Sequence, residues 1–337
     1  MKKLVMSFEM KSLKANNLSL KKAIVPCLLL ASTSTFAAEP AHLEMPHSKG
    51  TFMVEYKYMH MNMEGLQSGK DSVSKAAAFA SGEMTVPTKM TMDMHMIMPM
   101  YNITKSTSVM LMANYLSNKM DMEMSAGHKM DMETSGQGDT SLSLSHKFAD
   151  DMLAASFAVS IPTGSIDEKV TMHMPSMNMT MAAPYAMQLG SGTYDVTPSL
   201  TYLGAYFDVR YGAQASYKLR TGENDNGYTL GDEANFLTWV RKPVMGLTLD
   251  AQLDIKKWGA IDGKDTAIMT TVMGNKAPVT SFPGNYGGTM ATVSVGASMP
   301  ISMVSVGAQF NMPVYQDLNG LQMQRKMGAA VSLSAMF

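Results

Sequence analysis

The stretch Ala329-Ala330-Val331-Ser332-Leu333-Ser334-Ala335-Met336-Phe337 alternates with a period of two. Its odd-numbered residues form an apolar row, whereas its even-numbered residues include two serines. Because successive side chains of a β-strand point to opposite faces, the pattern predicts a strand with one apolar face. In lipid every backbone polar group must be paired within the protein, so a closed barrel is the only sheet that can span a bilayer. A strand of this kind that finishes on an aromatic residue, here Phe337, predicts the closing strand of a bacterial outer-membrane β-barrel.

The other end of the sequence predicts export. Six lysines precede an apolar run over 23–31, and small residues follow it, which is the order of a secretory signal. We therefore expect a signal peptide (1–38), a periplasmic N-terminal segment (39–50) and an outer-membrane barrel (51–337). The single cysteine, Cys27, lies in the signal, so the mature chain has no disulfide framework, thiol nucleophile or cysteine-ligated metal centre.

The charge balance of the mature chain argues against one class of partner. The whole sequence has 27 basic and 28 acidic residues, and residues 1–38 hold six lysines and one glutamate. The remainder carries 21 basic and 27 acidic residues, a net charge of −6, which gives no indication of nucleic-acid binding. After the signal, no apolar run reaches the length of a transmembrane helix, which leaves strands as the spanning elements.

Alternating segments recur through the mature chain. The clearest, 205–220, places Phe207 and Tyr211 on one face and Gln214 and Lys218 on the other. We predict about twelve antiparallel strands, at 51–64, 89–102, 107–120, 139–148, 152–162, 193–203, 205–220, 228–241, 245–258, 287–298, 301–314 and 327–337. Short turns alternate with longer connections, which predicts long outer loops and both termini in the periplasm. The alternative, a soluble β-sandwich or helical protein, is disfavoured because no long stretch has a helical period.

Methionine is very unevenly distributed along the chain. Of the 39 methionines, 26 lie in 45–187 and only 10 in 188–337, and all seven histidines lie before residue 188. The triplet Met-His-Met occurs at 59–61, 94–96 and 172–174. This concentration in one half of the barrel calls for a physical explanation.

Strand parity predicts where some of these side chains point. On the first strand, Glu55 and Lys57 are expected to face the lumen, and four methionines share their parity, namely Met53, Met59, Met61 and Met63. On the third strand, Met110 and Met112 are also predicted to face inward. A lumen does not need thioethers as filler.

Other methionines are predicted to lie elsewhere. On the second strand, the six from Met90 to Met100 are expected to face lipid as apolar filler, with Asp93 and His95 in the lumen. Those within 120–132 and 172–181 are expected in solvent-exposed outer loops.

Thioethers that alternate with acidic and imidazole side chains predict a soft-metal surface. Neutral sulfur selects Cu(I), or Ag(I) by the same softness, and binds without deprotonation. Cross-strand neighbours lie about 5 Å apart, so their side chains can converge on one ion. The candidate ligands are Met59, His60, Met61, Met63, Met94, His95, Met96, Met120, Met122, Met124, Met130, Met132, Met172, His173 and Met174. Two alternatives stay open: apolar filler that arose by compositional drift, and scavenging of oxidants.

Motifs for catalysis are lacking in the sequence. It contains neither a Gly-x-Ser-x-Gly elbow nor a His-Glu-x-x-His helix. His146 shares a strand with Ser141, Ser143 and Ser145, but its parity places it with Leu144, away from those serines. We therefore predict no catalytic or cofactor-binding residues and no enzyme activity.

Several segments together resemble a known family. They are Gly138-Asp139-Thr140-Ser141-Leu142-Ser143, Ile161-Pro162-Thr163-Gly164-Ser165-Ile166-Asp167, Gln188-Leu189-Gly190-Ser191-Gly192-Thr193-Tyr194-Asp195, Asn224-Asp225-Asn226-Gly227-Tyr228, Trp258-Gly259-Ala260-Ile261 and Pro313-Val314-Tyr315-Gln316-Asp317-Leu318-Asn319-Gly320. The sequence is similar in them to a family of bacterial outer-membrane transporters catalogued under the meta-cleavage pathway of phenol degradation. The resemblance implies a channel or transporter-like barrel. It carries over no functional residues and does not establish phenol as a substrate.

Three functions are compatible with the sequence. The first is an outer-membrane channel or transporter whose Met/His-rich outer half binds or passes Cu(I). The second is a passive channel for small apolar or aromatic solutes, with methionine as apolar filler, and the third is a structural surface protein without transport. Expected partners are outer-membrane lipid, the barrel assembly machinery through the strand that ends at Phe337, and a small solute or metal ion.

Overall fold

The computed structural model describes residues 43, 48–174, 177–269 and 278–337. The expected signal peptide and most of the expected N-terminal segment lie outside the described residues. Among those described, no helix is both long and apolar enough to cross a membrane.

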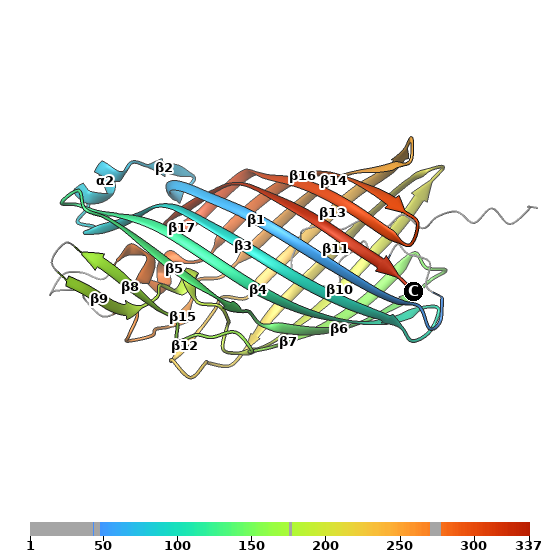
Figure 1. The fold of residues 1–337 in the computed structure, drawn as a ribbon, viewed down its shortest axis with the longest axis horizontal. Helices are drawn as coiled ribbons and strands as arrows, with labels where there is room; N and C mark the ends of the chain where they lie inside the picture. The colour runs from blue at the N-terminus through green and yellow to red at the C-terminus, as the bar shows by residue number, and fades with distance from the viewer. Residues whose placement is uncertain (1–42, 44–47, 175–176, 270–277) are drawn as a thin grey trace, which may run out of the picture.

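The described chain is built almost entirely of antiparallel strands. In sequence order the elements are β1 (Phe52–Gly69), β2 (Asp71–Val73), α2 (Lys75–Ala80), β3 (Thr85–Asn102), β4 (Thr107–Met124), β5 (Lys129–Gln137), β6 (Thr140–Phe148), β7 (Leu153–Ile161), β8 (Lys169–Met174), β9 (Met177–Ala182), η1 (Tyr185–Met187), β10 (Tyr194–Tyr206), β11 (Val209–Thr221), β12 (Tyr228–Thr229), β13 (Glu233–Val244), β14 (Leu247–Trp258), β15 (Asp262–Gly263), η2 (Val279–Ser281), η3 (Pro283–Asn285), β16 (Gly288–Ile301) and β17 (Val304–Met336). The ring runs β1-β3-β4-β6-β7-β10-β11-β13-β14-β16-β17, and β17 closes it by pairing with β1 (Figure 1). A closed antiparallel barrel is therefore confirmed.

The last strand, β17, runs along the barrel wall twice, once in each direction. Its first part pairs with β16 as far as Leu318, and its second part pairs with β1 from Leu318 to Met336. The Met336 backbone N–H donates to the carbonyl of Met303 at 3.2 Å, so the two parts lie side by side. The chain reverses at Asn319-Gly320, where Gly320 has a φ of +58°, a left-handed conformation that glycine adopts readily. When the two parts of β17 are counted separately, about twelve strand segments form the barrel wall in the described part of the chain, as predicted.

The two ends of the barrel differ. Short turns join β10 to β11, β13 to β14 and β16 to β17, and the long connections lie at the opposite end (Figure 1). The backbone N–H of Phe337 donates to the carbonyl of Phe52 at 2.8 Å. The last strand therefore finishes at the end of the barrel that carries the short turns. The turns predicted at 204, 242–244 and 299–300 lie two or three residues later, because β10, β13 and β16 continue further than predicted.

The strands segregate apolar from polar side chains. Leu144 on β6 is 50% exposed and Leu333 on β17 is 48% exposed, whereas the intervening Ser143, Ser332 and Ser334 are buried in the lumen. An apolar outer surface on a closed barrel is the arrangement that a bilayer requires. The predicted outer-membrane barrel, with the apolar row of its last strand facing outward, is confirmed.

Candidate functional site

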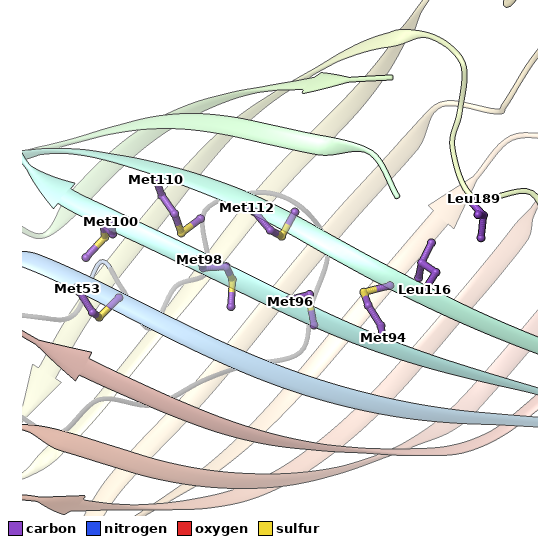
Figure 2. Close-up of a cluster of buried hydrophobic side chains, with 9 residues drawn as sticks. All are labelled: Met53, Met94, Met96, Met98, Met100, Met110, Met112, Leu116 and Leu189. Atoms are coloured by element: carbon purple, nitrogen blue, oxygen red, sulfur yellow. The ribbon is translucent and has the colours of Figure 1, made fainter. Parts of the chain in front are cut away.

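One side of the lumen is lined by methionine. Four methionines of β1, six of β3, five of β4 and two of β5 all lie on the lumen-facing side of these described strands. Directly paired residues point to the same face, and Met53 pairs with Met100 while Met63 pairs with Met90. Figure 2 shows Met53, Met94, Met96, Met98, Met100, Met110 and Met112 projecting from β1, β3 and β4 into the barrel interior. We call this set of side chains the methionine wall.

The prediction for the second strand is wrong. Met90 and Met98 are 2% and 1% exposed, while Ile97 is 51% exposed and faces lipid with Tyr101. The reason is the register with β1, where Glu55 pairs with Met98. Because Glu55 faces the lumen, its partner Met98 and the other even-numbered residues of β3 face the lumen too. The inward parity predicted for the methionines of the first and third strands is confirmed.

The same parity separates histidine from methionine. His60 and His95 lie on the outer face, opposite to Met94 and its neighbours on the wall. There the His60 Nδ1 lies 2.8 Å from an Asp93 oxygen, and Tyr56 forms a 2.8 Å hydrogen bond with His95. Asp93 and His95 were expected in the lumen and are instead on the outside. These two Met-His-Met triplets therefore do not bring imidazole and thioether to one point.

The methionines expected in an exposed outer loop are buried. β4 extends to Met124 and β5 continues beside it, so most of the stretch expected as a loop is a hairpin. Met120 pairs with Met132, and Met122 pairs with Met130, with all four side chains nearly excluded from solvent. Met124 is partly buried against the same cluster. The third triplet, Met172, His173 and Met174, has side chains that lie outside the described residues.

A loop segment enters the barrel and packs on the methionine wall. We call residues 185–191 the inserted segment. Met187 contacts the cluster that contains Met90 and Met120, and Leu189 contacts the cluster that contains Met94 (Figure 2). The Thr134 hydroxyl donates to the carbonyl of Met187 at 2.7 Å. The lumen is therefore narrowed from the side of the long loops.

Asp139 ties the inserted segment to the barrel. It lies between β5 and β6, and its carboxylate accepts hydrogen bonds from the backbone N–H of Gly164, at 3.0 Å, and from the backbone and hydroxyl of Ser191, both at 2.8 Å. Gly164 and Gly190 pack so closely that a Cβ at Gly190 would lie 2.3 Å from the Gly164 carbonyl oxygen. The role of Asp139 was not predicted from the sequence, although these glycines belong to the segments that carry the family resemblance.

The inserted segment is held at its outer end by an aromatic cluster. Tyr185 packs edge-on against Tyr228, with ring centroids 4.9 Å apart, and against Tyr286 at 5.6 Å. The Tyr286 hydroxyl donates to the carbonyl of Thr280 at 2.6 Å. Burial raises the pKa of both Tyr228 and Tyr286 above the usual range. These rings stay neutral and apolar at ordinary pH and form a cap that joins three loops.

The wall opposite the methionines is charged. Arg220 on β11 pairs with Asp195 on β10 and donates to Glu233 on β13 at 2.8 Å, and Lys256 on β14 pairs with Glu233 at 2.5 Å. Asp208 lies exposed in the turn between β10 and β11 and is not part of this wall. Within the described part of the chain, no group of three His, Cys, Asp or Glu side chains could hold a metal ion.

Solved structures with a similar fold include several channels. No family model matches the sequence, and no curated protein matches it. An outer-membrane channel from Pseudomonas putida F1 superposes with a TM-score of 0.58 at 14% identity, over 91% of this chain and 100% of that one. A mutant of the TodX monoaromatic hydrocarbon channel gives 0.48 at 8% identity, over 88% and 94% of the two chains. A FadL homologue of Pseudomonas aeruginosa gives 0.41 at 10% identity, over 93% and 98%.

Proposed function

We propose that this protein is a passive outer-membrane channel for small apolar or aromatic solutes. The observation that carries the proposal is the methionine wall, which extends from Met53 and Met100 near the short turns to Met122 and Met130 near the long loops. It gives an apolar solute a continuous surface inside a barrel whose other walls are polar.

Thioethers suit passage better than tight binding. Methionine is flexible and polarizable, and each sulfur–aromatic contact contributes only about 0.3–1.5 kcal/mol. Conduction requires several sites of this kind, each favourable enough to enter and weak enough to leave. The inserted segment, with Met187 and Leu189 on the same surface, narrows the path without interrupting its apolar character.

The likeness in fold to the Pseudomonas putida channel supports a channel. Membership of the transporter family indicated by the sequence segments, and recognition of the β17 strand by the barrel assembly machinery, are parts of the same proposal. The lack of a catalytic motif in the sequence agrees with a non-enzymatic role.

The alternative functions are less well supported. Copper binding by Met-His-Met triplets needs imidazole and thioether on one face, whereas His60 and His95 point outward. A purely structural surface protein would not need the methionines of four neighbouring strands on the lumen side alone.

The test changes the polarity of three wall side chains while keeping their size similar. Met94, Met96 and Met112 are replaced together by glutamine, which is as long as methionine but polar, or by leucine, which is apolar. Protein-dependent uptake of radiolabelled toluene by intact Gram-negative cells should fall about tenfold or more in the glutamine variant, equivalent to about 1.4 kcal/mol. The leucine variant should stay within about twofold of the parent. Equal uptake by the parent and the glutamine variant would refute the proposal, provided that both migrate as folded barrels in unheated gels.

A further inference from the structure

A row of methionines crosses three neighbouring strands at the long-loop end. Met90 on β3 pairs directly with Met120 on β4, and Met120 pairs directly with Met132 on β5. The three side chains are 1–2% exposed. One step further along, Met122 pairs with Met130 on the same face. Five thioethers are thus gathered in one buried patch of the lumen wall.

This patch and the side chains packed around it are almost entirely methionine. The surrounding cluster of described residues is methionine throughout, apart from Val170 and Ala183. On the outer face of the same strands the sequence uses hydrocarbon and aromatic side chains, such as Ile97, Leu111 and Tyr115. The thioethers of these strands are therefore concentrated on the lumen side.

We propose that Met90, Met120 and Met132 form a binding site for a soft monovalent cation such as Cu(I). Directly paired residues on neighbouring strands lie about 5 Å apart, and methionine has three rotatable side-chain bonds, so the three sulfurs can converge on one ion. Neutral thioethers select soft ions and bind without losing a proton. This inference does not require solute passage, although the three residues belong to the methionine wall.

The two neighbouring rows, one with Met61 and Met92 and the other with Met59 and Met94, are less suitable for a cation. Met61 on β1 accepts a 2.8 Å hydrogen bond from the Arg325 side chain, so its sulfur is already engaged by a positive group. Met94 pairs with Leu116, which has no donor atom. These contacts leave the row of Met90, Met120 and Met132 as the better site.

A groove of mixed charge lies beside the hairpin of β4 and β5. It is lined by three carboxylates and two lysines, together with a threonine and the two methionines of the next pair: Asp121, Glu123, Asp131, Lys75, Lys129, Thr88, Met122 and Met130. Asp121 lies directly opposite Asp131, and the nearby lysines Lys89 and Lys119 offset the repulsion between these like charges. Alternation along the strands places Asp121 and Asp131 on the face opposite to Met120 and Met132, so these carboxylates are not ligands of the proposed site.

The test is anaerobic titration of the full-length barrel in detergent with Cu(I), against bicinchoninate as competing chelator. Replacing Met90, Met120 and Met132 by leucine should weaken Cu(I) binding by at least about tenfold. The matched control replaces Met299, Met312 and Met327, which are exposed on the outer face, by leucine. Its affinity for Cu(I) should stay within about twofold of that of the parent.

Two results would overturn the inference: no Cu(I) binding by the parent, or equal loss of binding in both variants. X-ray absorption of the loaded parent provides a second check, since the site predicts sulfur neighbours, and nitrogen or oxygen neighbours alone would contradict it. Toluene uptake by the glutamine variant of Met94, Met96 and Met112 reports on the solute path, and none of these three residues belongs to the proposed cation site. Failure of the metal site and failure of the solute path are therefore distinguishable.

Discussion

Replacing Glu233 by alanine is expected to destabilise the barrel by about 3–5 kcal/mol, because it removes one partner from a buried network of charges. Glu233 accepts from Arg220 at 2.8 Å and from Lys256 at 2.5 Å through its two different oxygens. Arg220 also pairs with Asp195, which is only 1% exposed. Lys218 lies beside Glu233 in register and adds a third positive group. Without Glu233, Arg220, Lys218 and Lys256 lose the carboxylate that they share.

Urea unfolding in lipid vesicles, followed by tryptophan fluorescence, measures this loss. Glu233→Gln keeps an oxygen for Arg220 but removes the charge, so it should lie between the parent and the alanine variant. The control, Glu64→Ala, removes an exposed carboxylate on β1 and should change stability by no more than about 0.5 kcal/mol. If Glu233→Ala were as mild as this control, the network would contribute no more than surface charges do.

Replacing Leu111 by arginine is expected to cost about 2–4 kcal/mol, the range for a cation that faces lipid near the middle of the bilayer. Leu111 lies on the outer face of β4 and is 41% exposed. It pairs directly with Leu142 of β6, which is also exposed, so the outer surface around it is apolar. A charged side chain at Leu111 has no water to solvate it there.

A second arginine on the same strand is the control. Ser117 has the same outward parity as Leu111 and is exposed, and it is followed by Lys119, which pairs with Glu133 at 2.5 Å. This part of β4 lies in a polar zone, so Ser117→Arg should cost only about 0–1 kcal/mol. Equal losses at Leu111 and Ser117 in the same vesicle unfolding assay would mean that the bilayer is not where the apolar band indicates.

The faces of most strands could be predicted from the sequence because their two rows differ in polarity. On β6, leucine alternates with serine, and on the second part of β17, Val331 and Leu333 alternate with serine, so the lipid side is unambiguous. On β3 the contrast misleads, because an unbroken methionine row reads as apolar and its neighbours Asp93 and His95 read as polar. Only the pairing with Glu55 on β1, which is not visible in either strand alone, fixes the true direction.

The candidate site was predicted less completely than the fold. The methionine side of β1 and the Met110–Met112 part of β4 followed from parity, but the inserted segment did not. Its position depends on contacts between residues far apart in sequence, such as Asp139 with Ser191 and Thr134 with Met187. These contacts leave no periodic signal in the sequence. The burial of Met120 and Met132 was missed for a similar reason, because a stretch of strand beyond the membrane was interpreted as a loop.

The most direct test of the solute path is an anomalous diffraction experiment on crystals soaked in bromobenzene, a small apolar aromatic with a strong bromine signal. Bromine peaks are expected inside the barrel, along the methionine wall between Met53 and Met122 and beside Leu189. Peaks confined to the lipid-facing surface, with none in the lumen, would contradict the proposed solute path.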